Sequence, residues 1–293
     1  IMSDSTNPPS DVCCTVVTDE CDKDPAGCSN HGEDVHIHVH VHVHRHCCSA
    51  ATAAVTKPVK LQVIKFGFTS VAIGNSSYPN LMAQVKEPAN YGPNGTYNKI
   101  QSVDAIDAAA DIVAPSITAA ELKAKYDVLS VGLHNSSFTV AQADRLKEYA
   151  ALGGVLLLAC DNGAAVGMLN VLQRFGHTGT LAGVPVVGVY SGLSSTTENL
   201  SSYFGNSSGV TIKGSASLAM TATQLPPGSK VLATFGAYVL FWLVGGTMGR
   251  VIAFSDIELT TTEVSGTTVD NGQEKFLNNM MGYAFDQVLA SAG

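Results

Sequence analysis

The chain has 293 residues, enough for one large α/β domain or two small domains with a full hydrophobic core. Only 14% of its residues are charged and only 16 are Lys or Arg, so the composition gives no basic footprint for nucleic acid. No apolar run approaches the length of about 18 residues that a membrane span requires. The formal net charge of −8 lies mostly at the beginning, where residues 1–34 contain eight acidic side chains and one lysine.

Residues 1–34 are polar and show no hydrophobic period, which is typical of a segment that does not fold alone. Six of the seven cysteines bracket residues 35–46, and an even set in a short polar segment predicts disulfide bonds in an oxidising compartment. Metal thiolates are the alternative, although the vicinal pairs lack the Cys-x₂-Cys spacing of familiar zinc sites. The disulfide connectivity stays open. The six residues are Cys13, Cys14, Cys21, Cys28, Cys47 and Cys48.

Residues 35–46 alternate histidine with Val, Ile or Arg. Because successive side chains of an extended chain point to opposite faces, this alternation predicts one strand with an imidazole face and an apolar face. A single strand cannot close a metal site, but imidazoles from two paired strands would surround a copper, zinc or nickel ion. A pH-responsive charged face and an inert polar face are the alternatives. The predicted ligands are His36, His38, His40, His42, His44 and His46.

The sequence divides into an arm, residues 1–56, and a body, residues 57–293. The arm contains the predicted strand and an Ala/Thr-rich linker. An isolated strand leaves its backbone hydrogen-bonding groups unpaired, so residues 35–46 need a partner strand from the body or from a neighbouring subunit.

The body alternates strands and helices, which predicts a parallel sheet covered on both faces. Its clearest signals are the capping box of Thr139 and Gln142, the helix end at Gly153 and Gly154, and the continuous apolar run that follows. The first expected elements are strands 59–66 and 127–133, helix 139–152, strand 155–159 and helix 164–175. The later ones are strands 184–190, 210–213, 231–235, 238–244 and 250–254 and a final helix over 273–289.

Three short motifs of the body suggest a family. They are Tyr126-Asp127-Val128-Leu129, the strand Val155-Leu156-Leu157-Leu158-Ala159 after a Gly-Gly helix end, and Gly249-Arg250-Val251-Ile252-Ala253-Phe254-Ser255-Asp256. Residues of about 59–290 thereby resemble the class I glutamine-amidotransferase-like fold, and more narrowly its non-catalytic branches, in which a helix of the Phe-Leu-x-Asn kind follows. Here that helix contains Phe276-Leu277-Asn278-Asn279. The resemblance implies a three-layer α/β sandwich with a mostly parallel, flavodoxin-like or amidotransferase-like sheet.

In the catalytic branch of that family a nucleophilic cysteine occupies a sharp turn between strand and helix, and Cys160 falls at this place. The glycines on both sides of the family's cysteine are absent, and the late His-x-Glu motif is replaced by Ser255-Asp256-Ile257-Glu258. We therefore expect a buried, non-catalytic Cys160 and no enzyme, with a cysteine-dependent hydrolase as an alternative. His134 and His177 are expected to be structural. For Asp161, Asp256 and Glu258 we expect solvated positions at the sheet edge.

Five Asn-x-Ser/Thr sequons beside the paired cysteines favour a glycosylated protein that is secreted, extracellular or at the cell surface. They begin at Asn75, Asn94, Asn135, Asn199 and Asn206. The start at Ile1 would fit the removal of a secretory leader.

Two functions follow from these patterns. In the first, the protein is a non-enzymatic structural subunit that polymerises with itself into a filament or sheath, because its N-terminal strand adds to a neighbour in a head-to-tail contact. In the second, it is a secreted metal-binding or metal-scavenging glycoprotein that does not polymerise.

Overall fold

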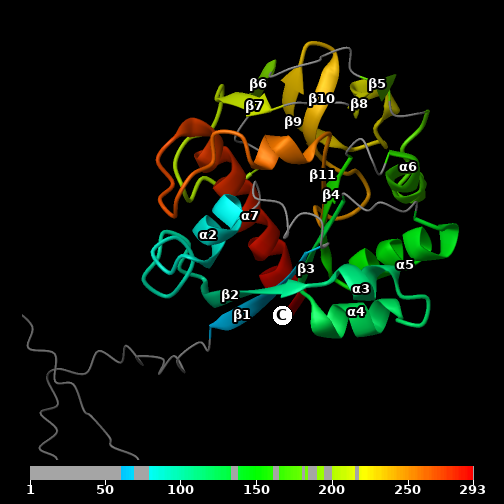
Figure 1. Cartoon of the computed structure of the whole chain (residues 1–293), viewed down its shortest axis with the longest axis horizontal. Helices are drawn as coiled ribbons and strands as arrows, with labels where there is room; N and C mark the ends of the chain where they lie inside the picture. Colours follow the sequence, from blue (N-terminus) through cyan, green and yellow to red (C-terminus); the bar gives the residue numbers. More distant parts are fainter. Residues whose placement is uncertain are drawn as a thin grey trace, which may run out of the picture. The chain divides into compact units, whose positions relative to one another are not determined.

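The computed structural model of the chain describes residues 61–68, 79–132, 138–160, 165–179, 182–183, 190–194, 200–214 and 218–292 (Figure 1). Several predictions lie outside these residues and stay predictions. They concern the strand over residues 35–46 with its histidines, the six cysteines of the arm, His134, Asp161, and the sequons at Asn75, Asn135 and Asn199.

Five neighbouring parallel strands form the centre of the sheet, in the order β2-β1-β3-β4-β11. Their bounds are β1 (Gln62–Phe68), β2 (Ile100–Asp107), β3 (Val128–Val131), β4 (Val155–Ala159) and β11 (Val251–Phe254). Antiparallel strands extend the sheet beyond β11, first β10 (Tyr238–Leu243) and β9 (Lys230–Phe235), then β6 (Tyr190–Ser194) and β7 (Thr211–Gly214). A branch consists of β8 (Leu218–Thr221), which pairs with β10, and β5 (Ala182–Gly183), which pairs with β8.

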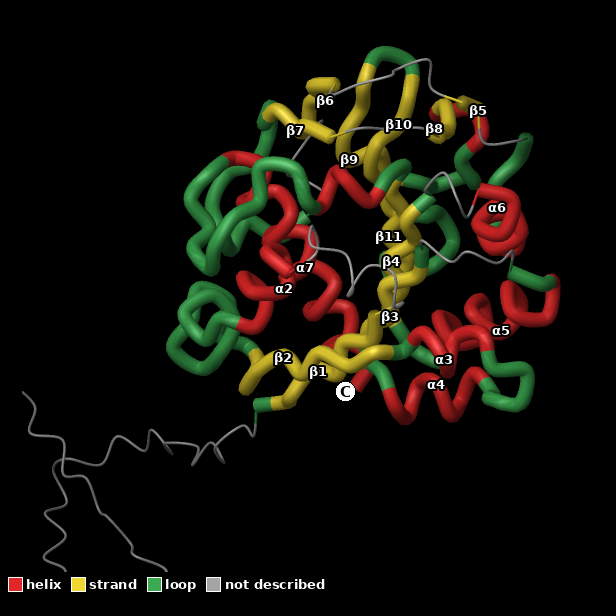
Figure 2. Tube along the Cα trace, in the orientation of Figure 1, coloured by secondary structure: helices red, strands yellow, loops and turns green. Residues whose placement is uncertain are grey.

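Helices cover both faces of the parallel centre (Figure 2). One face carries α3 (Ala109–Val113), α4 (Ala119–Lys125), α5 (Val140–Ala151) and α6 (Ala165–Arg174), and the other carries α2 (Pro79–Lys86) and α7 (Gly272–Ala292). The side chains of β4 show how this arises, since Leu157 packs in the core of α2 and α7 whereas its neighbours Leu156 and Leu158 pack in the core of α3–α6. The predicted α/β class with a three-layer arrangement is confirmed.

Local signals of the sequence account for the elements next to the carboxyl edge. Thr139 and Gln142 form the predicted capping box, because Thr139 Oγ1 accepts from Gln142 N at 3.3 Å and Gln142 Oε1 accepts from Thr139 N at 2.8 Å. All five residues of β4 are buried, as a central parallel strand requires. Gly153, between α5 and β4, has φ +94°, a left-handed conformation that glycine adopts without strain.

The prediction that the second strand of the body begins at Asp127 is wrong. The second strand is β2 (Ile100–Asp107), and α2, α3 and α4 were also not expected. Only Ile100 and Val103 of β2 are buried, since this strand lies at the edge of the sheet, and its sequence therefore shows no apolar run. A signal for α4 was present in the sequence, namely the capping box of Thr118 and Glu121.

Two short 3₁₀ helices complete the described elements, η2 (Ala222–Gln224) and η3 (Ile257–Thr260). Among the described helices, none combines the length and the apolar character that crossing a membrane demands.

Candidate functional site: the carboxyl edge of the parallel sheet

The parallel strands β1, β3, β4 and β11 end at a common edge, and open α/β sheets bind their ligands at such an edge. Phe68, Gly132, Cys160 and Ser255 lie at or just beyond the ends of these strands. The strand ends approach closely there, because a Cβ on Gly132 would lie 2.5 Å from Cβ of Ala159. The loops 69–78, 133–137 and 161–164, which continue β1, β3 and β4, lie outside the described residues.

Cys160 follows β4, at the place where the sequence resemblance put a candidate nucleophile. Its backbone N–H donates to the carbonyl of Phe254 at 2.8 Å, so it continues the pairing of β4 with β11. Its side chain is 0% exposed and packs in the apolar core together with Met168 and Leu172 of α6. A thiol in this position acts as a small core side chain, as expected from the sequence.

His177 is the histidine of the described body, and both of its ring nitrogens have partners. Trp242 Nε1, which only donates, lies 2.9 Å from His177 Nε2, so Nε2 is the acceptor. The proton is then on Nδ1, which lies 2.9 Å from the carbonyl oxygen of Leu172. Burial lowers the pKa of His177, while the bond to Leu172 opposes this shift. The ring is therefore neutral, buried and engaged away from Cys160, and it does not form a nucleophile–base pair with that residue.

The residues at the position of the family's late His-x-Glu motif have a local role. Asp256 is 2% exposed rather than solvated, and its Oδ1 accepts from the backbone N–H of Glu258 at 2.9 Å, which caps η3. The expectation of a solvent-facing Asp256 is thus wrong. Glu258 is half-buried in the same turn.

A small cavity lies between this edge and the helices α2 and α7. Its volume is about 20 Å³, which is room for about one water molecule. Its walls are apolar except for Ser130 and Thr260; they consist of Phe66, Phe68, Leu81, Met82, Ser130, Leu157, Phe254, Thr260, Met280 and Met281. This cavity is too small for an organic substrate.

No protein-family model matches the chain, and no curated protein does. Three solved structures share a similar course of the backbone. The mmIFT52 N-terminal domain has 12% identity and a TM-score of 0.44, over 76% of this chain and 97% of that one. Cytoplasmic protein STM3548 from Salmonella typhimurium has 13% identity and a TM-score of 0.43, over 75% and 98%. A glutamine amido transferase from Methylobacillus flagellatus has 10% identity and a TM-score of 0.43, over 79% and 96%. Likenesses this distant carry no information about activity.

Two of the predicted glycosylation sites lie in the described part of the chain. Asn94 and Asn206 are both exposed and both lie in loops, so each side chain faces solvent. Asn206 Oδ1 accepts from Ser208 N at 2.9 Å, which orders the sequon locally. Their modification stays a prediction.

Two features were missed from the sequence: a buried polar group at the carboxyl edge, and a side chain that binds the backbone of an outer strand. Ser255 Oγ is fully buried and has no hydrogen-bond partner among the described residues. The side chain of Gln273 binds the outer strand β7. Its only signal in the sequence is its place in the Asn-x-x-Glu start of α7, and this pattern does not reveal which strand it contacts.

Proposed function

We propose that this chain is a non-enzymatic extracellular structural protein, which assembles into a filament or sheath through its N-terminal strand and binds a transition metal on the histidine face of that strand. The observation that carries the proposal is the alternation of six histidines over residues 35–46. Six consecutive choices of histidine on one face exceed what a merely polar face requires.

The geometry of a strand links metal binding to assembly. Histidines two positions apart on a strand are separated by about 6.6 Å, whereas a paired strand offers side chains at about 5 Å. An ion held by nitrogen ligands at about 2.0–2.1 Å therefore needs side chains from two strands. One copy of the chain contains one such strand, so the remaining ligands come from the strand that pairs with it.

The body supports a structural rather than a catalytic role. Cys160 is enclosed in the core, and both nitrogens of His177 are occupied by Leu172 and Trp242. Acyl transfer by a thiol requires an accessible nucleophile with a base in contact, and the described residues supply a packed core at that place.

The test is to image and analyse the full chain. We expect electron micrographs to show filaments in the presence of Zn²⁺, and elemental analysis to find bound metal that chelator removes. Replacement of all six alternating histidines by asparagine is expected to abolish both, while His31→Asn, outside the alternation, serves as the matched control. Discrete particles with and without Zn²⁺ would contradict the proposal.

The second candidate is a secreted metal-binding glycoprotein that does not polymerise. It is favoured by the exposed sequons at Asn94 and Asn206 and by the acidic residues 1–34. Bound metal in discrete particles would support this candidate over the filament.

A further inference from the structure

β2 and β7 end the sheet, and they differ in whether their outward backbone groups are hydrogen-bonded within the described residues. From this difference we infer that the outer edge of β2 binds residues 35–46 of a second copy of the chain. The inference rests on the proposed function, because it names the surface that the assembling strand binds. It is carried by the described geometry of β2, β1 and β7.

The edge at β7 is closed by a side chain. Gln273 of α7 accepts from Lys213 N through Oε1 at 2.8 Å and donates through Nε2 to Lys213 O at 2.8 Å. Nε2 also donates to Leu259 O at 2.9 Å. The primary amide thus takes the place of the peptide group of a further strand, and an incoming chain would have to displace it.

The edge at β2 is open. This strand ends the strand order, and within the described residues only β1 pairs with it. The loop around Gly92 approaches its beginning, since a Cβ on Gly92 would lie 3.6 Å from Gln101 O. Residues 103–107 remain, with N–H and C=O groups on the side away from β1. Such a row of groups is a template for strand addition.

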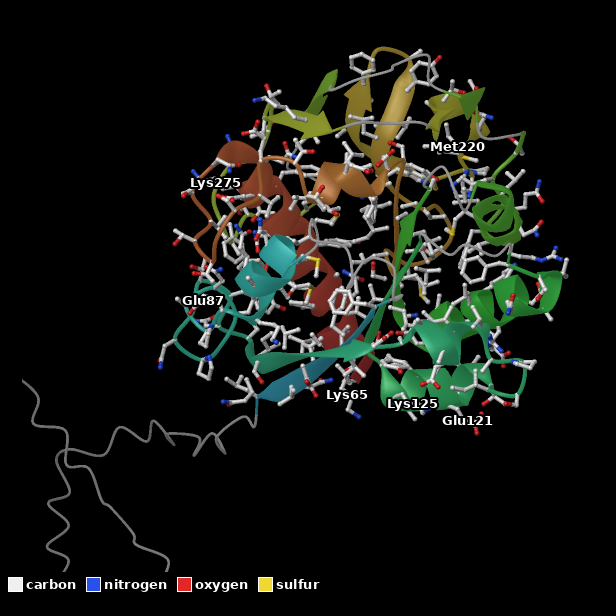
Figure 3. All side chains as sticks on the ribbon, in the orientation of Figure 1. Lys65, Glu87, Glu121, Lys125, Met220 and Lys275 are labelled. Atoms are coloured by element: carbon white, nitrogen blue, oxygen red, sulfur yellow. The ribbon has the colours of Figure 1, made fainter. Side chains whose placement is uncertain are left out.

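The two faces of β2 match the two faces of the arm strand. Val103 and Ala105 contribute to the core of α2 and α7, and they lie beside Ile64 and Phe66 of β1. Asp104 points to the other face and is exposed. It pairs with Lys65, which Figure 3 labels and whose Nζ donates to Ala124 O of α4 at 3.2 Å. An added strand with its valines on the core face places its imidazoles next to Asp104.

Charge favours the arm over another copy of β2 as the occupant. β2 carries the exposed acidic residues Asp104 and Asp107 and no basic residue, so the pairing of two β2 strands would bring like charges together, which is unfavourable across strands. The arm strand instead contains Arg45 and six histidines, which are neutral or positive. Opposite charges across strands stabilise the pair.

The length of the linker is compatible with a second copy as the donor. The 14 residues 47–60 extend up to about 50 Å, enough to reach a neighbour. The same length also reaches the edge of its own body, and the mixing experiment below distinguishes these two sources of the strand.

The first experiment measures assembly of the full chain with Zn²⁺ by sedimentation velocity. Asp104→Lys places a lysine on the open edge, and Thr211→Lys places one on the closed edge at a residue that is also exposed. We expect Asp104→Lys to raise the concentration needed for assembly about tenfold or more, and Thr211→Lys to leave it unchanged. Equal assembly of Asp104→Lys and wild type, or equal loss in both variants, overturns the inference. A wild type that stays monomeric overturns the proposed function itself.

A mixing experiment tests whether the strand comes from a second copy. A chain with Asp104→Lys keeps the donor strand, and a chain with Val39→Pro and Val41→Pro keeps the acceptor edge. At a concentration that just suffices for wild type, neither variant assembles alone if the inference holds, and their mixture forms one-to-one pairs that do not grow further. A mixture that stays monomeric overturns pairing between copies. Circular dichroism on each variant confirms that its body is folded.

Discussion

The two outer strands of the sheet, β2 and β7, both have backbone N–H and C=O groups that face away from the sheet, and the two strands differ in what binds these groups. At β7 the free N–H and C=O of Lys213 are bound by Gln273 of the same chain, whereas the free groups of β2 over residues 103–107 have no strand beside them in the described structure. A protein that blocks one edge with a buried amide and leaves the other open is suited to addition in one direction only. If copies assemble as proposed, we expect a strand to be added at β2 and not at β7.

The closed edge depends on the first turn of α7, where Glu274 is the residue after Gln273. Glu274 is 0% exposed, and its carboxylate accepts from the backbone N–H groups of Ser265 and Asp270, both at 2.9 Å, and of Asn271 at 3.2 Å. Asn271 Oδ1 accepts from Glu274 N at 3.0 Å in return, the reciprocal pattern of a capping box. These hydrogen bonds hold the first turn of α7 in place, and this turn positions Gln273 against β7.

The largest effect on this comparison is expected from Glu274→Gln. The neutral amide loses charge-assisted hydrogen bonds to buried N–H groups and turns an NH₂ toward at least one of them, so the free energy of unfolding falls by about 2–4 kcal/mol. Urea denaturation checks this. Glu263→Gln is the matched control in the neighbouring loop, since Glu263 has only an exposed ion pair with Lys213 at 2.9 Å, and its loss costs about 0.5 kcal/mol or less. Equal effects in both variants would contradict the assigned role of Glu274.

The same carboxylate gives a pH dependence with a defined sign. Burial alone would raise the pKa of Glu274, but the N–H donors of Asp270, Ser265 and Asn271 and the amide of Gln84 lower it below its usual range. Its stabilisation is therefore complete above about pH 4.3, the pKa of the unfolded chain, and is lost as the pH falls through the lower pKa of the folded state. Denaturation curves between pH 6 and 3 should show a smaller decline for Glu274→Gln than for wild type. A parallel decline in both would argue against this carboxylate as a source of acid sensitivity.

Gln273→Ala is expected to have the next largest effect, because it opens the closed edge. The N–H and C=O of Lys213 lose their partner, and the free energy of unfolding falls by about 1–3 kcal/mol. Light scattering should also reveal association at the newly exposed edge. Gln101→Ala is the control, since Gln101 is exposed on β2 and its truncation changes stability by about 0.5 kcal/mol or less. If Gln273→Ala is as stable and as soluble as this control, the hydrogen bonds of Gln273 to Lys213 do not contribute to stability or to protection of the edge at β7.

A substitution away from both edges, at the start of α5, is expected to have the smallest effect on stability. Thr139→Ala removes the acceptor for Gln142 N at the start of α5, which costs about 1 kcal/mol. Thr139→Ser retains the hydroxyl and should restore most of the loss in thermal denaturation. A defect that serine does not restore would place the contribution of Thr139 in its methyl group instead.

The sequence predicted what depends on neighbouring residues. The capping box at Thr139 and the apolar run of β4 are local signals, and both are present in the structure as expected. β2 was missed because an edge strand with two buried residues has no recognisable apolar period.

Features that depend on distant residues were not accessible from the sequence. Gln273 meets Lys213 across 60 positions of the chain, and Trp242 meets His177 across 65. The local sequence around each of these residues does not show which distant residue it contacts. The burial of Cys160 was expected because the sequence offers it no positioned base and lacks the flanking glycines, while the burial of Asp256 was not expected.

The contact between Trp242 and His177 has a practical consequence for spectroscopy. Trp242 is the one tryptophan of the chain and is 0% exposed, so the long-wavelength fluorescence of the protein comes from a single indole inside the body. Unfolding exposes this indole to water and shifts its emission to the red. Because residues 1–60 contain no tryptophan, the signal follows the integrity of the body alone. In one sample, light scattering can therefore report association, while the wavelength of the tryptophan emission reports unfolding of the body.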